Sequence, residues 1–110
     1  MDSALSWLGT AEMAGEAWLR HTTPDKYTRQ TLEHSNEALR SIAHDLLEAP
    51  PGGIDTASLS RALARNQDHI AQMVRLVRER NAPAFSSQLD SLRADRKVVK
   101  QLADDIKPKQ

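Results

Sequence analysis

The chain has 110 residues, of which 27% are charged, with 15 basic residues, 15 acidic residues and no cysteine. A single domain of this length buries roughly two thirds of the surface that its unfolded chain exposes, so it can form a core without metals or disulfides. The lack of cysteine excludes a disulfide framework, a thiolate nucleophile and a cysteine-type zinc site.

Two further exclusions concern the membrane. No stretch approaches the roughly 18 apolar residues that a membrane span needs. Residues 1–4 are not a basic segment followed by an apolar run, as a secretory signal would be. We therefore expect a cytoplasmic protein that does not bind membranes.

The first predicted helix covers about residues 3–20. Gly9 and Gly15 lie in its interior, where each costs about 1 kcal/mol relative to alanine. Small residues on this helix would let another helix approach closely. Apolar and small residues recur on one face at helical spacing, namely Leu8, Ala11, Gly15, and Trp18 or Leu19.

The second predicted helix covers residues 24–48. Thr23 is a preferred N-cap, and Pro24 suits the first helical position because its missing N–H has no partner there anyway. The helix is expected to stop at residues 50–53, where two prolines are followed by two glycines. Its apolar stripe consists of Leu32, Leu39, Ile42 and Leu46.

Two more helices are predicted over residues 56–80 and 84–106. Asp55 is a preferred N-cap for the third helix, and Asn81 suits a left-handed C-cap at its end. Pro83 prevents the third helix from continuing. The two apolar stripes are Leu59, Leu63, Ile70, Met73 and Val77, then Phe85, Leu89, Leu92, Val99, Ala103 and Ile106.

Four amphipathic segments with short connections favour an all-α fold, an antiparallel up-down-up-down four-helix bundle. We expect residues 1–110 to form one such domain. The alternative is a three-helix core over residues 24–106, with the first helix contributing to a dimer interface.

The zero net charge hides an asymmetry. Residues 1–54 hold four basic and eight acidic residues, a net charge of −4, whereas residues 55–110 hold eleven basic and seven acidic residues, a net charge of +4. In one interpretation the two halves attract each other inside the bundle. In the other, an exposed basic face meets an acidic partner.

Folding the segments as a bundle brings polar residues to one depth, where other layers are apolar. Three interpretations remain open: a structural polar layer that fixes register, an arginine that rests its stem on the core with its head in water, or a pocket for a ligand or metal. Metal-binding bundles place Glu-x-x-His ligands inward. The histidines here do not have that spacing, so we predict neither a metal nor a cofactor. The residues of this candidate layer are Glu12, His34, Ser35, Asn66, His69 and Arg96.

A strip of the first helix is a candidate interface because it holds both tryptophans, a residue type enriched at contact surfaces. In the alternative interpretation the two indoles cover the ends of the bundle core. The strip consists of Trp7, Ala11, Ala14 and Trp18.

Nucleic-acid binding is not expected. Arg61, Arg65 and Arg75 share one face, but Asp68 and Glu79 interrupt it, whereas duplex binders show a continuous basic footprint.

No motif for nucleophilic catalysis is present, so we predict no catalytic residue. The sequence favours a small non-enzymatic protein that acts as a protein–protein interaction or adaptor module, with a homodimer as one form of it. The alternative is a bundle that binds a small molecule or metal in the polar layer.

Overall fold

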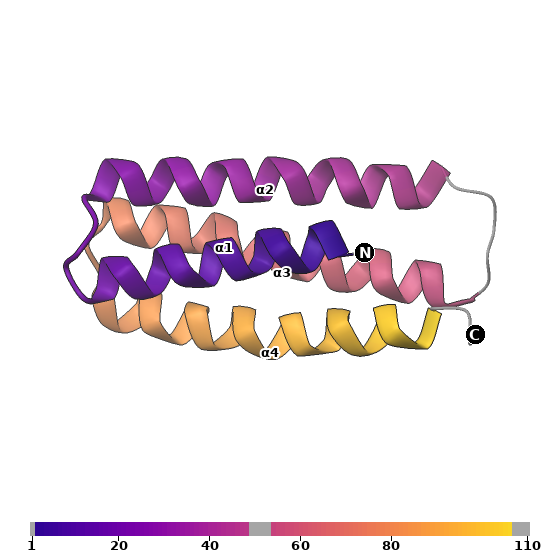
Figure 1. Cartoon of the computed structure of the whole chain (residues 1–110). Helices are drawn as coiled ribbons and strands as arrows, with labels where there is room; N and C mark the ends of the chain where they lie inside the picture. The colour runs from indigo at the N-terminus through magenta and orange to yellow at the C-terminus, as the bar shows by residue number, and fades with distance from the viewer. Residues whose placement is uncertain (1, 49–53, 107–110) are drawn as a thin grey trace.

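A computed structural model describes residues 2–48 and 54–106. It contains four helices: α1 (Asp2–Leu19), α2 (Asp25–Glu48), α3 (Ile54–Arg78) and α4 (Ala82–Ile106). Each helix runs back alongside the one before it, and the α1–α2 and α3–α4 connections lie at the same end (Figure 1). The predicted all-α four-helix bundle is therefore confirmed.

The helices form a four-cornered bundle in which α1 and α3 occupy one diagonal. α2 and α4 each pack against both of these helices, and within the described residues no Cα atom of α2 lies within 8 Å of a Cα atom of α4. Because α1 packs on its own chain, the structure does not adopt the alternative of a three-helix core with the first helix set apart.

All four helices begin one or two residues away from the predicted positions, and two of these shifts displace a predicted N-cap. The Pro24 carbonyl accepts the Thr28 N–H at 3.0 Å, so Pro24 rather than Thr23 is the N-cap of α2. α3 begins at Ile54, so Asp55 lies inside the helix and does not precede it.

The predicted role of Asn81 was wrong. The left-handed residue after α3 is Arg80, with φ 54°, and the Asn81 N–H donates to the Leu76 carbonyl at 3.0 Å in a Schellman motif. Asn81 instead caps the start of α4, where its Oδ1 accepts the Ala84 N–H at 3.2 Å. The connection has the predicted length of three residues but lies two residues earlier, at residues 79–81, so the same asparagine serves the next helix.

The core runs along the bundle axis and receives residues from all four helices. The rings of Trp18 and Phe85 pack against each other at the end where the two connections lie, with centroids 4.6 Å apart and planes inclined at 56°. The residues of the four predicted stripes whose burial is described lie inside or against this core, apart from Gly15 and Ala103, which are buried but are not members of it. Its largest fully buried members are Phe85, Leu8, Leu32, Leu39, Leu59, Leu63, Ile70, Met73, Leu89 and Leu92.

The two glycines of α1 have different surroundings. A Cβ on Gly15 would lie 3.2 Å from both Met73 and Phe85, and 3.3 Å from Leu89. A Cβ on Gly9 would meet only the guanidinium of Arg96, at 3.5 Å. Gly15 is therefore the position where a small residue permits close helix packing.

These surroundings predict opposite outcomes for two alanine substitutions. Gly9→Ala should raise the free energy of unfolding by about 1 kcal/mol, because alanine is the better helix former. In Gly15→Ala the same gain is offset by crowding against three side chains, which typically costs about 1–3 kcal/mol. Urea unfolding measures both, and equal stabilisation by the two substitutions would contradict the packing at Gly15.

Candidate functional site

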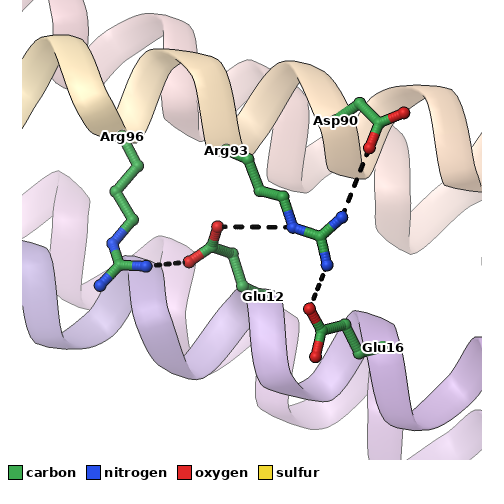
Figure 2. A network of polar contacts seen from close by, with 5 residues as sticks. All are labelled: Glu12, Glu16, Asp90, Arg93 and Arg96. Atoms are coloured by element: carbon green, nitrogen blue, oxygen red, sulfur yellow. Dashed lines mark hydrogen bonds and ion pairs between the residues drawn. The ribbon is translucent and has the colours of Figure 1, made fainter.

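A network of ion pairs joins α1 to α4 (Figure 2). Glu12 contacts two arginines: it pairs with Arg96, and its other oxygen lies 3.8 Å from Nε of Arg93. Arg93 also pairs with Glu16 on α1 and, at 3.4 Å, with Asp90 on its own helix. Arg93 is thus engaged by three carboxylates, and Arg96 by one.

Glu12 is the buried centre of this network, since its side chain is only 12% exposed. A carboxylate in that position loses hydration, which is tolerable only where cations and hydrogen bonds replace the water. Arg93 and Arg96 supply them from the facing helix. The Arg96 head therefore binds Glu12, while its side chain stays 41% exposed.

The predicted polar layer divides into separate parts, and one member lies outside it. Ser35 and Asn66 are fully buried, but each donates to a carbonyl of its own helix: Ser35 to Thr31 at 2.9 Å, and Asn66 to Ala62 at 3.1 Å. His34 is exposed and so does not belong to the layer. The reason is rotational: residues at one depth of a bundle can still point to different sides of their helices.

His69 belongs to a second polar cluster, between α3 and α4. One ring nitrogen contacts Gln88 Oε1 at 3.2 Å, and the other contacts Asp95 Oδ2 at 2.6 Å. Arg65 lies 3.8 Å from the same carboxylate. Both ring nitrogens are occupied, so His69 would have to give up a partner to act as a base or a metal ligand.

The described helices contain no group of three or more side chains placed to hold a metal ion. None of these helices is long and apolar enough to cross a membrane.

Ion pairs also connect the acidic and basic halves of the sequence. Glu33 on α2 lies 3.8 Å from Arg78 on α3, and Asp25 lies 3.3 Å from Arg80. Together with the Glu12 and Glu16 pairs, these contacts are what the first interpretation of the charge asymmetry predicts.

Asp25, the first residue of α2, links the end of α1 to the α3–α4 connection. Its Oδ1 accepts the Trp18 indole N–H at 2.8 Å, and this bond, together with the Arg80 guanidinium, holds the pKa of the Asp25 carboxyl below its ordinary value. A lowered pKa means that ionised Asp25 stabilises the fold. This contribution is complete above about pH 4 and is lost as pH falls through the lowered value.

The structure divides the candidate interface strip into two pairs. Ala11 is fully buried and Trp18 is 8% exposed, so both belong to the core of the chain and not to a surface. Trp7 and Ala14 are half-buried and remain accessible. The predicted strip included two core residues because α1 carries apolar or small residues on more than one side. Its sequence therefore does not reveal which side faces inward.

Two exposed side chains, missed in the sequence analysis, adjoin the accessible pair. Met13 is 72% exposed and Tyr27 is 65% exposed. Two shallow depressions, of about 520 and 340 Å³, share Thr10 and run along the outer side of α1 to α2. We call their lining the uncharged face: Ser3, Ser6, Trp7, Thr10, Met13, Ala14, Thr23, Tyr27 and Thr31.

The predicted site did not include Arg93, Glu16 or Asp95. The spacing of the charged residues could have indicated the first two. Glu12 and Glu16 are four residues apart, and Arg93 and Arg96 are three residues apart. The members of each pair therefore lie on one side of their helix. Asp95 offered no such signal, because the pattern of its helix does not indicate which neighbour it meets.

No family model, curated protein or solved structure matches the chain.

Proposed function

We propose that the protein is a non-enzymatic interaction module that associates with a second copy of itself through the uncharged face. The observation that carries this proposal is the composition of that face. At the average of the chain, which is 27% charged, nine residues would include two or three charges, and these nine include none. Met13 and Tyr27 meanwhile present large apolar surfaces to solvent.

The lack of charge favours a second copy as the partner. In a two-fold dimer the same patch meets itself, so a charge near the axis faces a like charge. Burying such charges without opposite partners is strongly unfavourable. A face of small hydroxyl, methyl, thioether and aromatic groups can meet its own copy without that penalty.

The dimensions of the face suggest a weak dimer. α1 has 18 residues and is therefore about 27 Å long. The axis of α2 lies about 8–10 Å from that of α1. The area that the patch can bury is therefore close to that of the smallest specific interfaces, those that bury less than about 1,200 Å² in total. We therefore expect a dissociation constant in the micromolar range.

Sedimentation velocity over a concentration series tests the proposal. The unmodified protein should pass from monomer to dimer, whereas Met13→Glu should stay monomeric because it places two carboxylates in the shared face. Met13 is exposed, so the substitution should change stability by less than about 0.5 kcal/mol.

Val98→Glu is the matched control. Val98 is an exposed apolar residue on α4, the helix diagonal to α2. This variant should dimerise like the unmodified protein. Either of two results would refute self-association through the uncharged face: an unmodified protein that remains monomeric up to about 0.5 mM, or equal loss of the dimer in both variants.

A further inference from the structure

A pocket of about 430 Å³ opens between α1 and α4 beside the ion-pair network, and it concentrates positive charge. Its volume falls within the range of about 300–1,000 Å³ that is usual for small-molecule sites. Leu5 and Glu12 line it from α1. Four cations line it from α4: Arg93, Arg96, Lys97 and Lys100.

The cations of the pocket differ in how far they are already neutralised. Arg93 is engaged by Glu12, Glu16 and Asp90, and Arg96 by Glu12. Lys97 and Lys100 are exposed and take part in no ion pair within the described part of the chain. The excess positive charge of the pocket therefore lies at Lys97 and Lys100, which follow Arg96 on α4.

Helix stability does not explain why Lys97 and Lys100 lie beside Arg96. Lys100 follows Arg96 by four residues and Lys97 by three, and like charges at these spacings destabilise a helix. The three side chains leave the helix within a segment that is about 6 Å long, measured along the axis of α4. One anionic group can therefore be approached by two lysine ammonium groups and by the outer side of the Arg96 guanidinium.

The rest of the lining sets the character of the anion. Leu5 is half-buried and packs against the core, and the hydrocarbon stems of lysine and arginine are apolar up to their charged ends. A bare phosphate would leave this apolar surface in water. A ligand with an anionic head and an apolar body would use both parts of the pocket.

We propose that this pocket binds a small amphiphilic organic anion, whose head contacts Lys97, Lys100 and Arg96 and whose apolar body lies against Leu5. The proposal agrees with the second interpretation of the charge asymmetry, in which a basic face meets an acidic partner. It does not depend on self-association, because the uncharged face lies towards α2, on another side of α1.

Fluorescence titration of the full chain with anilinonaphthalene sulfonate, an amphiphilic anion, tests the proposal. The unmodified protein should bind the probe saturably. The double variant Lys97→Gln/Lys100→Gln should bind it at least about tenfold more weakly. Since both lysines are exposed and unpaired, and removing them relieves repulsion between like charges, the double variant should keep its helical circular dichroism and should melt no lower than the unmodified protein. Decanoate below its micelle concentration should displace the probe, whereas inorganic phosphate at the same concentration should not.

The matched control is Lys26→Gln/Arg40→Gln, which removes the same charge from two exposed positions on α2. It should bind the probe within about twofold of the unmodified protein. Equal weakening in the control would show general charge attraction, and displacement by phosphate as effective as by decanoate would show binding of any anion. Either result, or unaltered binding by the Lys97/Lys100 variant, would overturn the proposal.

Discussion

Trp18→Ala is expected to lower the free energy of unfolding by about 3–5 kcal/mol. The oligomeric state of the folded protein should not change. Trp18 is 8% exposed, and its ring lies 4.6 Å from that of Phe85. Truncation would remove this contact, open a cavity, and take away the donor that holds Asp25. A loss of this size is a large fraction of the 5–15 kcal/mol by which small proteins are stable.

Chemical unfolding and sedimentation on the same variant separate a core role from an interface role. If Trp18 were an interface residue, the variant would shift from dimer to monomer while its stability as a monomer stayed unchanged. Asp25→Asn provides the comparison, because it keeps an oxygen acceptor for the indole and removes only the charge. It should therefore cost much less than Trp18→Ala.

The helices were largely predictable because proline and glycine mark their ends and apolar spacing marks their inner faces. α2 and α4 agree with the predicted ranges to within two residues, and the expected stripes line the core. The errors at Thr23 and Asn81 arose where adjacent residues could each serve as a cap. Hydrogen-bond geometry, which sequence does not contain, decides between such neighbours.

The candidate site was less predictable. Depth along the bundle follows from counting residues back from each turn, and this placed Glu12 and Arg96 at the same depth. That count does not give the side of the helix on which a residue lies, nor the residue that its side chain contacts. For this reason His34 was grouped with residues that it does not join, and the pairing of His69 with Asp95 was not foreseen. In α1 the difficulty was greater, because small and apolar residues on several sides left its inward face undetermined.

Asn66 presents an unpaired polar atom in the middle of the bundle. The residue is fully buried, its Nδ2 donates to the Ala62 carbonyl at 3.1 Å, and its Oδ1 is buried without a hydrogen-bond partner. An unsatisfied buried polar atom costs about 1–3 kcal/mol. The one bond that the amide makes adds little, because the Ala62 carbonyl is also the regular helix acceptor for the backbone N–H of residue 66.

Asn66→Leu is therefore expected to raise the free energy of unfolding by about 1–2 kcal/mol. The melting temperature should rise by about 4 °C for each kcal/mol gained. Leucine has the same branched skeleton, so it replaces the amide without leaving a cavity, and replacing a buried polar group in this way is often stabilising. Thermal and urea unfolding measure the change, and sedimentation reports whether loss of the polar group alters the oligomeric state. Asn66→Asp is the control of matched shape: it places a charge at the same point and should be strongly destabilising. A clear drop in stability for Asn66→Leu would contradict this account. It would mean that the Asn66 amide has a role in the core that outweighs the cost of its unpaired oxygen.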